Sequence, residues 1–132
     1  MGAKLRFAKV IDRQMFYERG AKVHPGLDNE VLMHEEPGPA GAFLVLRGWG
    51  DDHGSFTEKW RIQEPEGRTI YESSPREIHV PTNGHVEKLE DEVADLEFDF
   101  AADGYTVVFT LDERDVARAT FTVKIDGGGA GR

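Results

Sequence analysis

The chain has 132 residues, no cysteine, 31% charged residues and a formal net charge of −9. This length is typical of one domain, and the lack of cysteine excludes a disulfide framework, thiolate catalysis and thiolate zinc sites. The negative charge argues against nucleic acid and anionic membranes as partners, because both require clustered lysine and arginine. The opening MGAKLRFAKVIDR has no long apolar stretch, so we expect a cytoplasmic protein without a signal peptide or a membrane-spanning helix.

Charge is distributed unevenly along the chain. Residues 87–115 hold eleven acidic and two basic side chains, whereas residues 1–24 hold six basic and two acidic ones. The simpler interpretation is a solvated acidic face that the basic start of the chain partly balances. The alternative is an electrostatic docking surface for a basic partner.

The first third of the chain has few regular patterns. GAKLRFAKVI, residues 2–11, predicts a β-prone run, followed by a turn at Asp12 and Arg13 that leads into QMFY. Residues 18–42 are rich in glycine, proline and acidic side chains, which is typical of loops. One short strand is expected there, near Val31 to Met33.

Residues 42–49 and 55–63, AFLVLRGW and SFTEKWRIQ, predict two strands joined by the loop GDDHGS in one hairpin. A register in which paired residue numbers sum to 105 places chemically matched side chains opposite each other. The predicted pairs are Phe43 with Ile62, Val45 with Trp60, Arg47 with Glu58, and Trp49 with Phe56. This register puts Trp60 deep in the core and Trp49 near the rim, and leaves Leu44 and Leu46 on a half-solvated face.

The middle of the chain continues with shorter elements. RTIYES and REIHV, residues 68–73 and 76–80, predict strands separated by a turn. In residues 85–96 the apolar side chains Val86, Leu89, Val93 and Leu96 recur at helical spacing. This spacing predicts a short helix near residues 85–95, and an irregular edge strand is the alternative.

The last third predicts a three-stranded antiparallel meander over DLEFDF, YTVVFTL and VARATFTVKI. The expected pairs are Phe100 with Tyr105, Phe98 with Val107 and Leu96 with Phe109, then Ala117 with Leu111, Ala119 with Phe109, Phe121 with Val107 and Val123 with Tyr105. The tail at 126–132, DGGGAGR, has no side chains suited to packing, so we expect it to be disordered. Residues 1–125 are then a single domain.

ADGYTVVFTLDERDVARATFTV resembles the closing hairpin of immunoglobulin-like β-sandwiches, in which a glycine and a tyrosine begin the penultimate strand and the tyrosine ties the corner. Asp103, Gly104 and Tyr105 carry this motif. The order FLVLRG, FTEKWRIQEPEGRTIY and DLEFDFAADGY is similar to a set of small, functionally uncharacterised bacterial immunoglobulin-like domains over roughly residues 42–125. The resemblance implies a fold rather than an activity. We therefore predict an all-β, immunoglobulin-like antiparallel β-sandwich of about seven strands.

Motifs for metal binding and catalysis are missing from the sequence. The five histidines show no HxH, HxxxH or HExxH spacing, and the tight clusters of histidine with carboxylates are HEE at 34–36 and DDH at 51–53. No GxSxG surrounds a serine, and no glycine-rich phosphate loop precedes a predicted helix. We expect no catalytic residue, no bound metal and no cofactor.

The loop between the two tryptophans is the candidate ligand site. Indole rings can stack on sugars, and carboxylates with a histidine can grip a polar ligand, which makes the candidate residues Trp49, Asp51, Asp52, His53 and Phe56. The leading hypothesis is nevertheless a non-enzymatic domain that acts through protein–protein contact or by self-association along a sheet edge. A small-ligand or carbohydrate binder that uses the Trp49 loop or a cavity is the alternative. A hydrolase whose cleft joins a histidine and a carboxylate is a third.

Overall fold

A computed structural model describes residues 2–24 and 28–126, and in these residues the chain forms eleven strands and one short helix. The elements are β1 (Lys4–Asp12), α1 (Arg13–Glu18), β2 (Glu30–Met33), β3 (Gly38–Pro39), β4 (Phe43–Gly50), β5 (Gly54–Gln63), β6 (Thr69–Glu72), β7 (Arg76–Val80), β8 (Glu87–Val93), β9 (Glu97–Phe98), β10 (Ala102–Leu111) and β11 (Arg114–Ile125). The all-β class is confirmed. The glycine-rich tail that we predicted to be disordered lies, beyond Asp126, outside the described residues.

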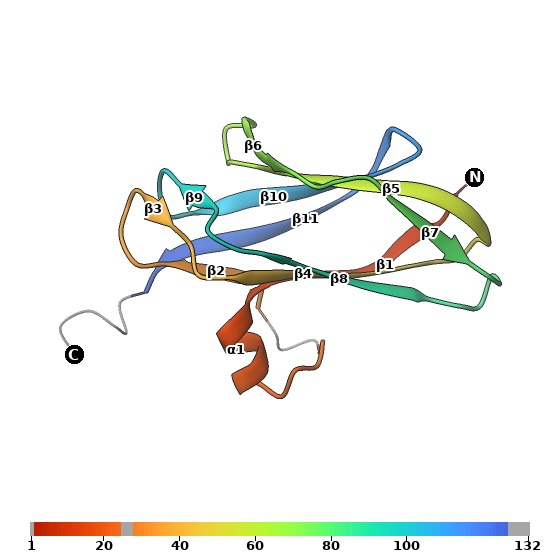
Figure 1. Cartoon of the computed structure of the whole chain (residues 1–132), viewed down its shortest axis with the longest axis horizontal. Helices are drawn as coiled ribbons and strands as arrows, with labels where there is room; N and C mark the ends of the chain where they lie inside the picture. The colour runs from red at the N-terminus through yellow and green to blue at the C-terminus, as the bar shows by residue number, and fades with distance from the viewer. Residues whose placement is uncertain (1, 25–27, 127–132) are drawn as a thin grey trace.

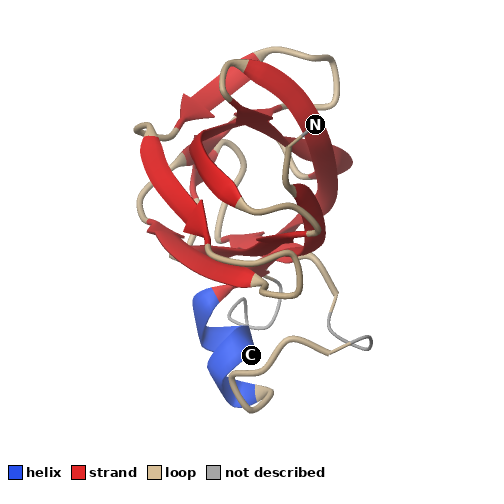
Figure 2. Cartoon of the chain, turned by 90° about the vertical axis from the view of Figure 1, so that its right-hand side faces the viewer, coloured by secondary structure: helices blue, strands red, loops and turns tan. Residues whose placement is uncertain are grey.

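Nine of these strands form one sheet that folds back on itself into two layers (Figures 1 and 2). The strand order is β6-β5-β10-β11-β2-β1-β4-β8, and β7 also pairs with β5. In Figure 1, β5, β6 and β10 lie in the upper layer, and β1, β2, β4 and β8 in the lower one. β2 runs parallel to both β1 and β11. The sheet is therefore mixed, whereas the sequence predicted antiparallel pairing throughout.

The predicted hairpin of β4 with β5 is wrong. β4 pairs with β1 and β8, whereas β5 pairs with β10, β6 and β7, so the two strands lie in opposite layers. All eight residues of β4 are buried. A strand with two apolar faces needs a neighbour on each edge and cover on each face, which a simple hairpin cannot supply.

The helix α1 covers the outer face of the lower layer (Figure 1). Asp12 caps it, because its Oδ2 accepts a hydrogen bond from the backbone N–H of Met15 at 3.1 Å. Phe16 then packs in a small buried cluster with Ile11, Leu44 and Leu46. The face of β4 that we expected to be half-solvated is thus buried beneath this helix.

Residues 85–95 contain the strand β8 at the end of the sheet order, so the short helix predicted there is wrong and the alternative of an edge strand is confirmed. β8 pairs antiparallel with β4, and Leu46 lies opposite Glu90. Leu89 and Val93 are separated by four residues, a spacing that places side chains on one face in both a helix and a strand. The segment forms a strand rather than a helix because a strand supplies backbone hydrogen bonds to the edge of β4 that β1 leaves unpaired.

The C-terminal hairpin of β10 and β11 is confirmed, but its register is shifted by two residues. Val107 pairs with Ala119, and Phe109 pairs with Ala117. A shift of two keeps each side chain on its predicted face, so small residues still lie opposite large ones. The first hairpin of the predicted meander is wrong, because β9 pairs with β3 rather than with β10.

A hydrogen bond ties the corner before β10. The hydroxyl of Tyr105 donates to the backbone carbonyl of Phe100 at 2.6 Å, and the Tyr105 ring packs edge-on against Phe98. Burial raises the pKa of Tyr105 to about 12, with a smaller contribution from the negative charge of Glu64. The tyrosine singled out in the sequence motif therefore anchors the chain where it enters the core.

Candidate functional site

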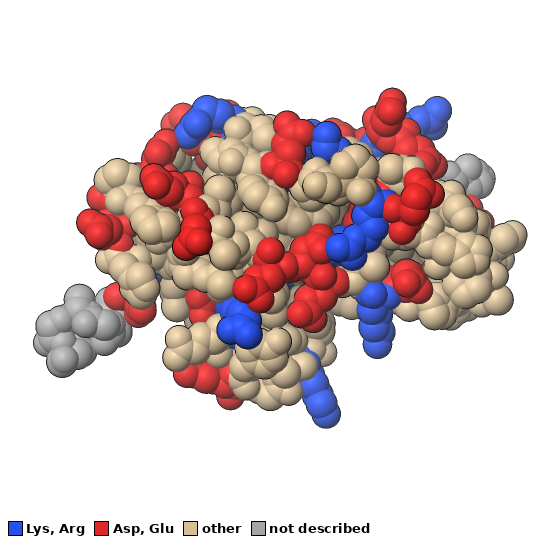
Figure 3. Space-filling view, viewed as in Figure 1, with Lys and Arg blue, Asp and Glu red and all other residues tan. Residues whose placement is uncertain are grey.

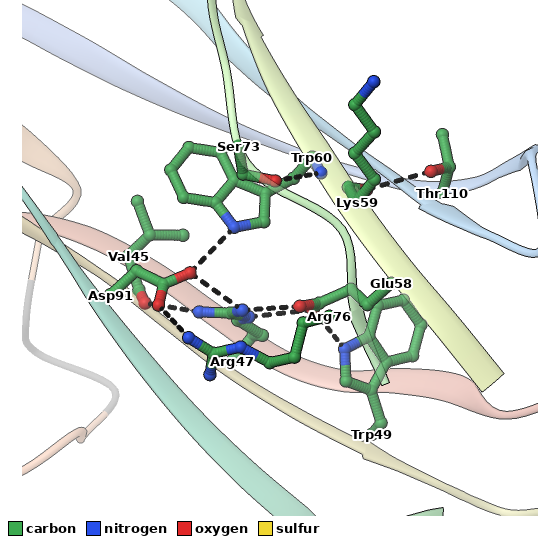
Figure 4. A network of polar contacts seen from close by, with 10 residues as sticks. All are labelled: Val45, Arg47, Trp49, Glu58, Lys59, Trp60, Ser73, Arg76, Asp91 and Thr110. Atoms are coloured by element: carbon green, nitrogen blue, oxygen red, sulfur yellow. Dashed lines mark hydrogen bonds and ion pairs between the residues drawn. The ribbon is translucent and has the colours of Figure 1, made fainter. Parts of the chain in front are cut away.

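Two buried charges join the layers (Figure 4). Arg47 on β4 donates from Nε and Nη2 to the two carboxylate oxygens of Glu58 on β5, at 2.8 and 2.5 Å. The side chains of Arg47 and Glu58 are 0% and 1% exposed. The sequence matched these two residues as neighbours within a hairpin, and the structure brings them together across the core instead.

Both tryptophans complete this buried network. Trp49 Nε1 donates to Glu58 at 2.7 Å, and Trp60 Nε1 donates to Asp91 at 3.0 Å. Asp91 on β8 also contacts Arg47 at 3.0 Å and Arg76 on β7 at 2.6 Å. No buried side-chain nitrogen or oxygen in residues 2–24 and 28–126 lacks a partner. The network is thus satisfied internally, and we assign it a structural role.

Trp49 was predicted to lie near the rim of the fold, and this prediction is wrong because Trp49 is fully buried. Its side chain is 0% exposed, and its ring packs edge-on against Phe109 with centroids 6.1 Å apart. Trp60 was expected in the core and is confirmed there, at 2% exposure. Neither indole offers a face on which a sugar could stack.

The carboxylates of the candidate loop hold the start of the chain. Asp51 binds Arg6 through both carboxylate oxygens at 2.6 Å. Asp52 accepts a hydrogen bond from the backbone N–H of Gly2 at 3.0 Å. The His53 side chain instead contacts Asn83, with Nδ1 2.7 Å from the Oδ1 of that residue.

Three of the predicted site residues line one cavity, which we call the end groove. Asp51, Asp52 and Phe56 meet the first residues of β1 and the turn between β10 and β11, at the right-hand end of Figure 1. The cavity has a volume of about 1120 Å³. Trp49 and His53 are not among the residues that line it.

A second groove, which we call the cationic groove, lies on the outer face of the lower layer beside α1. Its volume is about 980 Å³. Its apolar lining comprises Phe7, Phe16, Leu46, Val86 and Leu89. Its basic side chains are Arg6, Lys9, Lys22 and Lys88, together with His24, and Glu90 is its one acidic residue. The basic start of the chain was the sequence signal for this groove, but we interpreted it as a balance for the acidic stretch.

Two observations on the described residues bear on metal binding and on catalysis. Within residues 2–24 and 28–126, no three histidine or carboxylate side chains gather as metal ligands would. Ser55 Oγ lies 3.2 Å from His79 Nδ1, on exposed surface of β5 and β7. This pair lines neither of the two grooves.

Comparisons with known proteins inform the fold alone. No protein-family model matches the sequence, and no curated protein matches it. Among solved structures, the chain is similar to alkylpurine DNA glycosylase AlkC of Pseudomonas fluorescens, bound to DNA containing an abasic site analog, with a TM-score of 0.52 and 7% identity. The match covers 93% of this chain and 30% of that chain, so the present chain corresponds to less than a third of the glycosylase. Among the described residues, no helix has the length and apolar character needed to cross a membrane.

Proposed function

We propose that this chain is a non-enzymatic, immunoglobulin-like binding domain of the cytoplasm that acts through contact with another protein. The observation that carries the proposal is the cationic groove, where the apolar side chains of Phe7, Val86 and Leu89 are only partly buried. Exposed apolar surface rimmed by polar groups is typical of protein contact sites. The hydrogen bond from Tyr105 to Phe100 supports the immunoglobulin-like assignment, because it is the corner tie of such domains.

Contact with a different protein fits the surface better than self-association along the β8 edge of the sheet. β8 is the last strand of the sheet order, and it carries Glu87, Glu90, Asp91 and Glu92. Two copies paired through β8 would place like charges opposite each other, which opposes association. The cationic groove does not present a row of carboxylates, so this repulsion does not arise there.

Selection of displayed peptides tests this proposal. Peptides selected on the folded protein are expected to lose binding to Val86→Asn, which places an amide in the cationic groove. Val116→Asn is the matched control, because Val116 lines the end groove and is 47% exposed. A selection that yields no binder, or binders that respond only to Val116→Asn, would contradict the proposal.

A second candidate function is small-ligand binding in the end groove. It is favoured by Asp51, Asp52 and Phe56, which place carboxylates beside an apolar ring along a cavity of about 1120 Å³. Isothermal titration against a glycan panel tests it. Binding that is lost in Phe56→Ala supports this function, and no heat from any glycan at millimolar concentration would rule it out.

A further inference from the structure

We propose that the occupant of the cationic groove is an acidic amphipathic segment of another protein. This inference rests on the proposed function and adds the chemistry of the partner. Recognition would combine apolar contacts on the floor of the groove with carboxylates that reach its basic rim.

The floor of the groove is apolar, and part of it is the ring of Phe7 packed against β4 at Gly48. Gly48 makes this possible, because a Cβ at this position would lie 2.3 Å from Cε1 of Phe7 and 2.8 Å from Cγ1 of Val86. The ring of Phe7 can therefore lie against the backbone of β4. Val23, which borders the groove, is 40% exposed. An apolar face of a partner could therefore bury these side chains on binding.

The rim of the groove carries two lysines, Lys22 and Lys88, whose positive charge is not paired with a carboxylate of the described residues. Both lysines are exposed. Arg6 adds a third cation, although it is paired with Asp51. Glu90 is the single acidic residue in the lining.

The charge of the groove is opposite to that of the molecule as a whole. The chain has a net charge of −9, and carboxylates are spread over the face seen in Figure 3, while several Lys and Arg side chains project from its lower half. The net negative charge of the chain disfavours an acidic segment elsewhere, whereas the basic lining of the groove favours it there, which selects one docking position. A nucleic acid would extend beyond a groove of this size and meet the surrounding carboxylates.

The test uses three labelled synthetic peptides of about 14 residues with leucine and phenylalanine at helical spacing. Their polar positions are all glutamate, all glutamine or all lysine, and binding to the full chain is followed by fluorescence anisotropy. We expect the glutamate peptide to bind at least about tenfold more tightly than the glutamine peptide and to weaken as salt is raised. The lysine peptide should not bind.

Charge reversals locate the binding. Lys22→Glu and Lys88→Glu should each weaken the glutamate peptide by about tenfold, whereas Arg118→Glu on β11 makes the same charge change outside the groove and should leave affinity unchanged. Equal binding of the glutamate and glutamine peptides, with sensitivity to Val86→Asn, would overturn the acidic partner and leave the proposed function standing. No binding of the glutamate peptide, or binding instead to vesicles of phosphatidylserine and phosphatidylcholine in equal parts, would also overturn this inference.

Discussion

Replacing Glu58 by glutamine tests the account of the buried network. Glu58 accepts two hydrogen bonds from Arg47 and one from Trp49. An amide of the same shape turns an NH2 group toward these donors and leaves the charge of Arg47 buried. Removing one partner of a buried ion pair costs about 3–5 kcal/mol. Because Asp91 still lies 3.0 Å from Arg47, we expect the free energy of unfolding to fall by about 3 kcal/mol, at the lower end of that range.

The measurement is urea denaturation at pH 7 followed by far-ultraviolet circular dichroism, with linear extrapolation of the unfolding free energy. Asp115→Asn is the matched control, because Arg61 and Asp115 form a similar two-bond pair on the surface, with Asp115 49% exposed. That exposed pair should contribute no more than about 1 kcal/mol. If Glu58→Gln cost no more than Asp115→Asn, the assignment of Arg47 and Glu58 as the link between the layers would be refuted.

Two further predictions concern single positions. Gly48→Ala should destabilise the fold by about 1–3 kcal/mol, because its methyl group overlaps Phe7, whereas Gly84→Ala meets no atom within 4 Å and should be close to neutral in thermal unfolding. The pKa of Tyr105 is raised from 10.0 to about 12, so between these pH values the unfolded chain loses the phenol proton while the folded chain keeps it. Stability should therefore fall as pH rises from about 10 to about 12, and Tyr105→Phe should remove part of that fall; an identical pH slope in both proteins would contradict the burial of this hydroxyl.

Much of the strand content follows from local patterns, but the pairing of strands does not. Alternation of apolar residues in β10 and β11 specifies which side chains face the core, and these faces are as predicted even though the register differs by two. The same reasoning paired β4 with β5 because Arg47 and Glu58 are chemically matched. Such a match does not show whether two side chains meet on paired strands of one sheet or across two packed layers. Only the full set of neighbours of β4 resolves this ambiguity.

Local sequence patterns also predicted only part of the candidate site. The residues Asp51, Asp52 and Phe56 are close in sequence and share the end groove. The cationic groove instead combines β1 and α1, which are consecutive in the chain, with β8, which begins more than 60 residues after α1 ends. No local sequence motif predicts such a surface. The sequence feature that pointed to it was the net positive charge of residues 1–24. Trp49 was misplaced because the buried acceptor for its indole N–H lies on the opposite layer.

The position at which an acidic amphipathic peptide contacts the folded chain tests the central claim most directly. Backbone amide chemical shifts of the isotope-labelled protein would be followed by nuclear magnetic resonance during titration with the glutamate peptide. We expect the largest changes at the cationic groove, at Phe7, Leu46, Val86 and Lys88. Changes confined to the end groove around Asp52 and Phe56, or no changes at saturating peptide, would contradict that claim.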